Sequence, residues 1–103
     1  MRVIVLFNLR PGVTVADYET WAKTTDLPVV NALPSIESFR VFQATGVMGS
    51  GEAPPYQYIE VVDIADEAQF GADVATDTMK RIAAEFQALA DNPIFVTTTE
   101  LKA

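Results

Sequence analysis

The chain has 103 residues, half of them hydrophobic, and its 14 Asp and Glu outnumber its 7 Lys and Arg, which gives a formal net charge of -7. This acidity disfavours nucleic acid and anionic membranes as partners, because both are bound through clustered Lys and Arg. The sequence has no cysteine and no histidine, which excludes disulfides, thiolate or imidazole metal sites and histidine-activated hydrolase triads. We expect no metal and no cofactor.

The first strand is predicted over residues 2–9, where Val, Ile, Leu and Phe follow one another without polar alternation. Such a run is typical of a strand that is covered on both faces. It has no signal-peptide cleavage site and is too short to cross a bilayer. We therefore expect a soluble, cytoplasmic protein with one domain over residues 1–103.

The first helix is predicted over about residues 15–24, with Thr14 as its N-cap and Asp17 at the third position. The stretch TTDLPVVNALPS, residues 24–35, follows this helix. It is longer and more apolar than a connection between a helix and a strand needs to be. We interpret it as the wall of a pocket.

The remaining elements follow from alternation and capping. Two alternating segments, SIESFRVFQATG and YQYIEVVDI, predict a second and a third strand around the loop GVMGSGEAPP. A second helical region begins at Asp66 and is broken near Thr76. The segment DNP ends it, and the β-branched segment PIFVTTTEL predicts the fourth strand.

The order βαββαβ predicts an α+β fold, with a four-stranded antiparallel sheet and both helices on one face. Because the first strand is apolar on both sides, the uncovered face of the sheet should also be buried. The same face of a second copy, related by a two-fold axis, would cover it. We expect a homodimer.

A polar patch is predicted where the second and third strands pair. Registering them about the loop centre places Arg40 beside Glu60 on the uncovered face, with Tyr56 and Tyr58 nearby. There Arg40 could hold an anionic or carbonyl oxygen, and a tyrosine could donate a proton. The alternative is an ion pair that serves only the sheet.

Asp26 and Asn31 bracket the apolar segment LPVV within the pocket wall. Desolvation beside this segment would raise the pKa of Asp26 and make it a competent base near neutral pH. Alternatively, Asp26 caps a short helical turn that Leu27 and Pro28 begin.

Two further polar or aromatic residues are candidates for substrate binding. Asn8 interrupts the apolar first strand near its end, where its amide could reach a ligand or satisfy the following turn. Trp21 could stack on an aromatic substrate or pack in the core.

The sequence resembles a known family over nearly its whole length, in the segments MRVIVLFNLRPGV, YETWAKTTDLPVVNALPSIESF, PYQYIEVVDI and EFQALADNPIFV. It is similar to the RedY-like, or HapK-like, proteins encoded among bacterial pigment and alkaloid biosynthesis genes, notably those for prodiginines. That family is similar in fold to the dimeric α/β barrels, a ferredoxin-like group that includes cofactor-free monooxygenases. The resemblance implies a role in making a small aromatic natural product, and some relatives behave as cyclases.

Together these observations predict cofactor-independent cyclisation or condensation of an aromatic intermediate by proton transfer. The expected catalytic residues are Asp26, Tyr58 and Glu60, and the expected substrate-binding residues are Asn8, Trp21, Asn31, Arg40 and Tyr56. A cofactor-free monooxygenase of the same fold and a non-catalytic carrier of a pathway intermediate are the alternatives.

Overall fold

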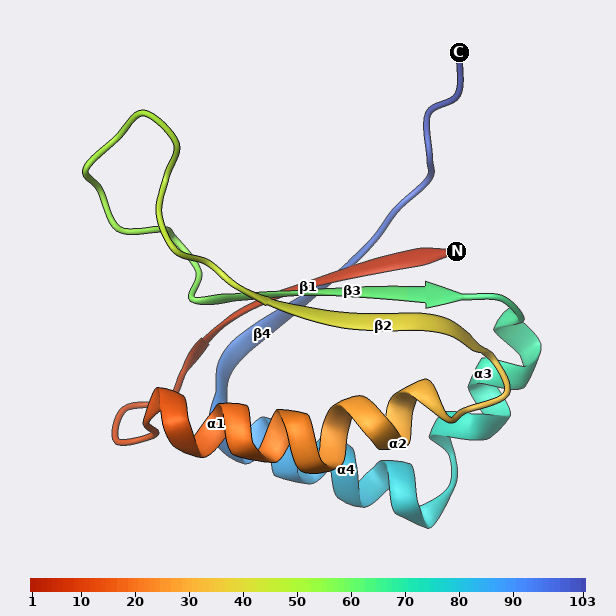
Figure 1. Cartoon of the computed structure of the whole chain (residues 1–103). Coiled ribbons are helices and arrows are strands. Elements are labelled where there is room, and N and C mark those ends of the chain that lie inside the picture. The colour runs from red at the N-terminus through yellow and green to blue at the C-terminus, as the bar shows by residue number, and fades with distance from the viewer.

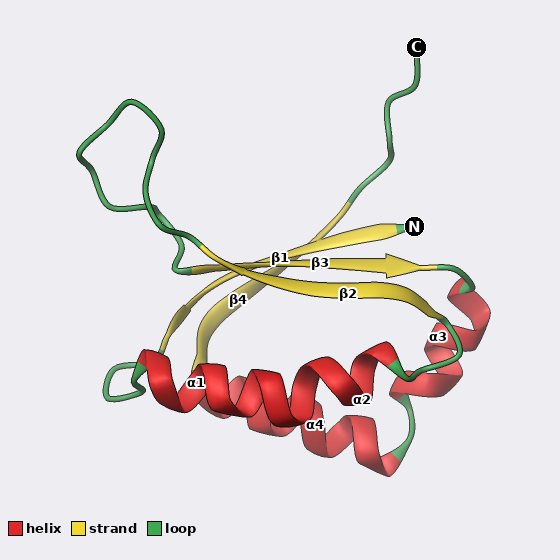
Figure 2. Cartoon of the chain, viewed as in Figure 1, coloured by secondary structure: helices red, strands yellow, loops and turns green.

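Four strands form one antiparallel sheet, in the order β2-β3-β1-β4, in the computed structural model, which describes all 103 residues. The strands are β1 (Arg2–Leu9), β2 (Ile36–Gln43), β3 (Tyr58–Ile64) and β4 (Ala90–Thr97). The helices are α1 (Val15–Trp21), the π-helical segment η1 (Ala22–Asp26), α2 (Leu27–Asn31), α3 (Glu67–Val74) and α4 (Asp77–Leu89). All helices lie on one side of the sheet (Figures 1 and 2). The predicted α+β fold, with ferredoxin-like order βαββαβ, is confirmed. No helix combines the length and the hydropathy needed to cross a bilayer.

The predicted caps at Thr14 and Asp66 are confirmed, and Thr76, where a break was predicted, is also a cap. The side chains of Thr14, Asp66 and Thr76 each accept a hydrogen bond from the backbone N–H three residues further on, at 3.0, 3.0 and 3.3 Å. These bonds satisfy N–H groups that have no partner inside their helix. The break near Thr76 separates α3 from α4, as the sequence predicts.

The stretch that follows α1 is helical through Asn31, so the expectation that the first helix ends near residue 24 is wrong. Pro28 has no N–H, and in a regular α-helix its ring would clash with the carbonyl four residues earlier. The chain instead forms a wider π turn, in which the N–H of Leu27 bonds to the carbonyl of Ala22, five residues back. The helix therefore continues past the proline and carries Asp26 in its widened turn.

An aromatic core closes the space between sheet and helices at one end. The ring of Phe7 stacks on Tyr58 at 5.5 Å between centroids and meets the edges of Tyr18 and Phe86 at 5.4 and 5.0 Å. All four residues are buried in the same cluster. Aromatic pairs in these geometries add to the stabilisation that burial provides. This core fixes α1 and α4 against the central strands.

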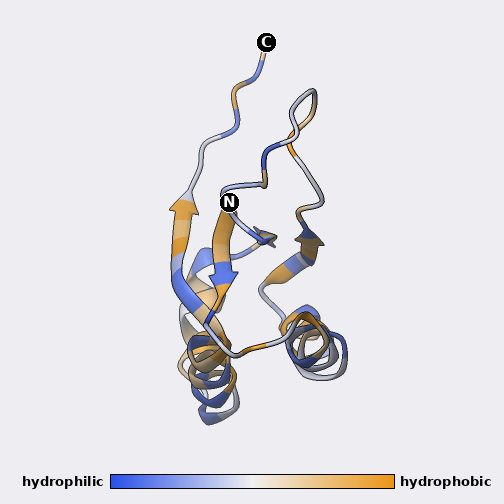
Figure 3. Ribbon diagram, turned by 90° about the vertical axis from the view of Figure 1, so that its left-hand side faces the viewer, coloured by the Kyte–Doolittle hydropathy of each residue, from blue (hydrophilic) through white to orange (hydrophobic).

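The other face of the sheet carries no helix (Figures 1 and 3). We call it the open sheet face; the strand pairing places on it Ile4, Leu6, Phe42, Ile59, Val61, Ile94 and Val96. Several of its side chains are well exposed, among them Phe42 at 46% and Ile94 at 45%. The ion-paired residues Arg2, Arg40 and Asp63 share this face. Exposed apolar side chains gathered on one face often mark an interaction site.

Strand β4 begins earlier than predicted, at Ala90 rather than at Pro93. Its pairing with β1 is irregular between Leu6 and Asn8, and Asn92 has a positive φ of 45°. Because β4 is an edge strand, it tolerates a proline that a central strand would exclude. The segment DNP thus bends the strand and does not precede it.

Candidate functional site

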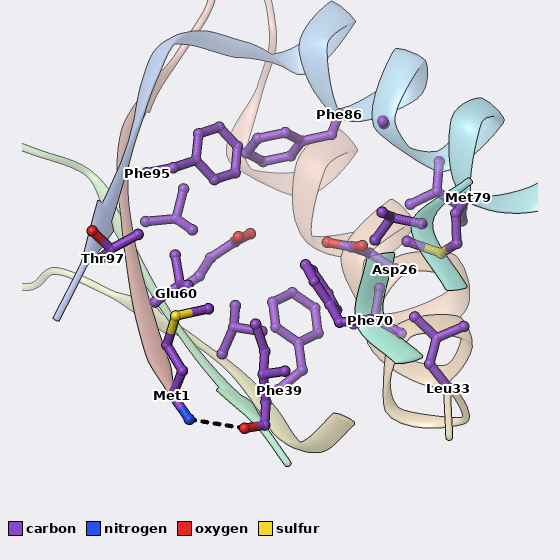
Figure 4. A pocket seen from close by; sticks show the side chains of 18 of the residues that line it. Met1, Asp26, Leu33, Phe39, Glu60, Phe70, Met79, Phe86, Phe95 and Thr97 are labelled. Carbon is purple, nitrogen blue, oxygen red and sulfur yellow. Dashed lines mark hydrogen bonds between the residues drawn. The ribbon is translucent and has the colours of Figure 1, made fainter. Parts of the chain in front are cut away.

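A cavity of about 420 Å³ lies between the helix-facing side of the sheet and the helices α2, α3 and α4 (Figure 4). This volume is in the range of sites that bind small molecules. Most of its lining is apolar: Met1, Val3, Val5, Val30, Leu33, Phe39, Val62, Ile64, Phe70, Val74, Met79, Ile82, Ala83, Phe86 and Phe95. The four remaining lining residues are Asp26, Glu60, Gln87 and Thr97.

Asp26 reaches this cavity from the π turn. It is the last residue of η1 and only 5% exposed, and its carboxyl group points into the cavity (Figure 4). Although it stands directly before α2, its side chain makes no capping hydrogen bond. The alternative in which Asp26 caps the turn begun by Leu27 and Pro28 is therefore wrong.

Glu60 reaches the cavity from the opposite wall. It lies in the middle of β3, where its cross-strand neighbours are Val5 and Val41. It is 5% exposed, and its Oε2 atom has no hydrogen-bond partner. Its carboxyl group points across the cavity toward Asp26 (Figure 4). A buried carboxyl oxygen without a hydrogen-bond partner lowers the stability of the folded protein. The presence of Glu60 in this place is therefore a reason to look for a ligand.

Burial raises the pKa of both carboxyl groups. Desolvation raises the pKa of Asp26 to about 7. Desolvation, together with the charge of Asp26, raises the pKa of Glu60 to about 8. The nearby Tyr18 hydroxyl group acts in the opposite direction and lowers the pKa of Glu60 in part. Its geometry does not meet the criteria for a hydrogen bond, so both oxygen atoms are without a partner. Because the two groups face each other, the negative charge of one favours the protonated form of the other. Near neutral pH the pair can both accept and donate a proton.

Tyr58 faces the helices, as Glu60 does, but lies outside this cavity. Its hydroxyl group donates a hydrogen bond to Oε2 of Glu19 at 2.9 Å, and burial together with this bond raises the pKa of Tyr58 to about 12. It lines a second, smaller cavity of about 130 Å³ beside α1. The structure thus brings together Asp26 and Glu60 but not the third predicted catalytic residue.

The predicted pairing of Arg40 with Glu60 is wrong. Arg40 lies opposite Val61, so it is on the open sheet face, whereas Glu60 faces the helices. The guanidinium group of Arg40 instead lies 3.9 Å from Asp63 and 5.6 Å from the ring centre of Phe42. The prediction placed the strands one residue out of register, and a slip of one residue moves a side chain to the other face.

The remaining predicted substrate-binding residues do not line the cavity. The Asn8 amide binds the backbone of the β2–β3 loop, with Oδ1 accepting from the N–H of Gln57 at 2.9 Å. The Asn31 amide binds backbone groups, and Trp21 donates from Nε1 to Glu85 at 2.8 Å. Tyr56 precedes β3 in the loop. Asn8 thus holds the β2–β3 loop and not, as its alternative predicts, the turn that follows it. Trp21 packs against the aromatic core, as its alternative predicts.

Most of the apolar lining carries no signal in the sequence that marks it as a site. Met79, Ile82, Ala83 and Phe86 recur at helical spacing, which is typical of a helix face packed in the core, but they line the cavity. A signal for Glu60 was present in β3, because it alternates in phase with Tyr58, Val62 and Ile64, all of which are apolar or aromatic. That phase assigns Glu60 to the core face.

A family model described as REDY-like protein HapK matches residues 1–101 of the chain. The chain is similar to the crystal structure of HapK from Hahella chejuensis, with 27% identity, a TM-score of 0.67 and coverage of 100% of this chain and 97% of that one. Among proteins with curated functions, none matches the chain.

Two other solved structures share the fold at lower identity. A dimeric ferredoxin-like protein of unknown function from Thermobifida fusca has 22% identity and a TM-score of 0.68, with coverage of 92% of this chain and 85% of that one. A mutant of SnoaB, a cofactor-independent oxygenase from Streptomyces nogalater, has 12% identity and a TM-score of 0.71, with coverage of 97% and 93%. At these identities the likeness describes the fold alone.

Proposed function

The chain belongs to the family of REDY-like HapK proteins, and on that premise we propose that it binds a flat, mostly apolar aromatic intermediate and cyclises or condenses it by proton transfer, without a cofactor. The observation that carries this proposal is the pair of buried carboxyl groups, Asp26 and Glu60, that face each other in an apolar cavity. The setting that fits the family is secondary metabolism in the cytoplasm, in a pathway for pigments or alkaloids such as the prodiginines.

The two carboxyl groups have different roles in this proposal. Asp26 is the base and removes a proton from the carbon or nitrogen atom that forms the new bond. Glu60 is the acid and donates its own proton to the oxygen atom that receives the displaced electron pair; burial raises its pKa, which favours the protonated form. The pair then holds one proton as before, now on Asp26, and transfer of this proton to Glu60 resets the site. The apolar walls keep water away from the reacting atoms.

Self-association through the open sheet face is part of the proposal. A dimeric relative of the same fold from Thermobifida fusca supports it, as do the exposed apolar side chains Phe42, Ile94 and Val96. The β2–β3 loop and the chain after β4 both extend away from the helices, on the side of the open face (Figure 1). There they could contact a second copy at the margins of the paired sheets.

The function is tested with the metabolite that accumulates when the gene is deleted from its host. That compound is isolated, incubated with the purified protein, and followed by mass spectrometry and oxygen electrode. We expect a product of unchanged mass, or one that has lost water, and no oxygen consumption. A product that gains an oxygen atom would instead assign the oxygenase chemistry, and tight binding without any product would assign a carrier.

The roles of the two carboxyl groups are tested with Asp26→Asn and Glu60→Gln, which keep the shape of each side chain. We expect each to lower turnover by about 100-fold or more, the usual contribution of one acid or base. The matched control is Glu52→Gln, which removes an exposed carboxylate from the β2–β3 loop. Full turnover in folded samples of both cavity variants would refute acid–base catalysis by this pair.

A further inference from the structure

The charge balance of the cavity sets a condition on its ligand. Among the side chains that line it, only those of Asp26 and Glu60 ionise, and no Lys or Arg is present to neutralise them. The N-terminal ammonium group of Met1, which also lines the cavity, donates to the backbone carbonyl of Ile64 at 2.9 Å and not to either carboxyl group. Glu60 presents an oxygen atom that is buried and without a hydrogen-bond partner. Both carboxyl groups point into the empty space (Figure 4). A carboxylate in such a place is stable only when a positive charge or a hydrogen-bond donor meets it.

The aromatic walls provide a second attraction for the same kind of charge. Four phenylalanine rings line the cavity, from β2, α3, α4 and β4: Phe39, Phe70, Phe86 and Phe95. The face of an aromatic ring attracts a cation and also stacks on a flat ligand. Two carboxyl groups between aromatic walls therefore suit a flat molecule that carries a cationic nitrogen.

We propose that the cavity selects aromatic ligands that carry a positively charged nitrogen, such as an ammonium, iminium or amidinium group, and rejects ligands that carry a carboxylate. This inference rests on the proposed function, since it describes the ligand of the same site. The nitrogen cation lies between Asp26 and Glu60, and the aromatic frame lies against the phenylalanine rings. A carboxylate in that place would face two groups of its own sign.

Binding of such a cation also releases protons. The titratable groups around it are Asp26, Glu60 and, behind Glu60, the buried Tyr18 hydroxyl, whose pKa is raised far above its usual value and which stays protonated. A positive charge favours the ionised form of the two carboxyl groups. At pH 7.5, where Asp26 and Glu60 are partly protonated, the cation displaces part of a proton into the buffer.

Three small probes with one aromatic frame test the inference: 1-naphthylmethylamine, 1-naphthylmethanol and 1-naphthoic acid. Their binding is measured by isothermal titration calorimetry at pH 7.5, in phosphate and in Tris, whose different ionisation enthalpies reveal proton release. We expect the amine to bind at least about tenfold more tightly than the alcohol, equivalent to about 1.4 kcal/mol. The acid should bind most weakly, and only the amine should release protons.

The double variant Asp26→Asn/Glu60→Gln should bind the amine and the alcohol with similar affinity, because the neutral amides keep the shape of the cavity but not its charge. The matched control Glu52→Gln/Glu67→Gln removes two carboxylates that are exposed and should keep the preference. Circular dichroism and thermal unfolding check that each variant is folded.

Three results would overturn the inference: equal or tighter binding of the alcohol or the acid, a preference that survives in the double variant, or no binding of the amine at millimolar concentration. Each of these leaves the proposed function standing if the isolated metabolite is still converted in a reaction that needs Asp26 and Glu60. Conversely, amine selectivity without any conversion would support the inference and refute the proposed catalysis.

Discussion

The side-chain amide of Asn31 forms two hydrogen bonds with the backbone of Phe39, accepting from its N–H at 2.9 Å and donating to its carbonyl at 3.0 Å. It thus pairs with β2 along the outer edge of the sheet as a neighbouring strand would. A third bond runs from the same amide to the carbonyl of Leu27 at 2.9 Å. The end of the helical segment is thereby fixed to the sheet.

Replacement of Asn31 by Ala should lower the free energy of unfolding by about 2 kcal/mol, because it leaves backbone groups at the β2 edge without partners. The measurement is urea unfolding followed by circular dichroism. Thr24→Ala is the matched control, since it removes only an exposed bond to the carbonyl of Thr20, and it should change stability by less than about 0.5 kcal/mol. Equal stability of Asn31→Ala and wild type would show that these bonds contribute nothing.

Stability should fall as pH rises, because of Asp26 and Glu60. Each has a higher pKa in the folded protein than in the unfolded chain, where such groups titrate near 4. The folded state binds the extra protons, so this stability is complete below about pH 4 and is lost as pH rises through about 7 and about 8. Each pKa unit of difference between the folded and unfolded states changes the free energy of unfolding by about 1.4 kcal/mol. We therefore expect the free energy of unfolding to fall by several kcal/mol by pH 9.

The check on this pH dependence is urea unfolding of wild type and of Asp26→Asn/Glu60→Gln between pH 5 and pH 9. The double variant carries no charge in the cavity at any pH, so its curve should be much flatter, and it should be the more stable protein at pH 9. Parallel curves would mean that the two groups titrate normally in the folded protein.

Tyr58→Phe should lower stability without abolishing turnover. The change removes the hydrogen bond to Glu19, which is worth about 1–2 kcal/mol for a partly exposed charged acceptor. The cavity that holds Asp26 and Glu60 is unchanged, because Tyr58 does not line it. Assays with the isolated metabolite should show kcat within about threefold of wild type, whereas a loss near 100-fold would restore Tyr58 to the catalytic role that the sequence suggested.

On the proposal that two copies pair through the open sheet face, Leu6→Glu should convert the dimer into a monomer, because it places a charge between Ile59 and Ile94. Sedimentation equilibrium at micromolar concentration measures the molecular mass. Ala84→Glu introduces the same charge on an exposed position of α4 and serves as the control, which should remain dimeric. If wild type itself sediments as a monomer, the pairing of sheets is refuted.

The fold was accessible from the sequence because its signals are local. The caps at Thr14, Asp66 and Thr76 lie next to the helices that they begin, and each strand has its own apolar alternation. Asp26 was also found locally, since its apolar neighbours predict desolvation. These inferences need no knowledge of which residues meet across the fold.

The composition of the site was not accessible in the same way, because it depends on register. The loop between β2 and β3 has no short turn that fixes the pairing, so the slip that separates Arg40 from Glu60 could not be read from it. The cavity itself is lined by side chains from all four strands and from α2, α3 and α4, so it depends on packing over the whole molecule. Neither quantity is encoded in a short segment.

The irregular start of β4 has a consequence for the behaviour of the protein at high concentration. Pro93 and the positive φ of Asn92 interrupt the outer border of the sheet, where a foreign strand would otherwise find a continuous ladder of backbone groups. Growth into fibrils needs such a ladder. In a chain this rich in β-branched and aromatic residues, the bend thus makes the β4 edge a poor template for amyloid assembly.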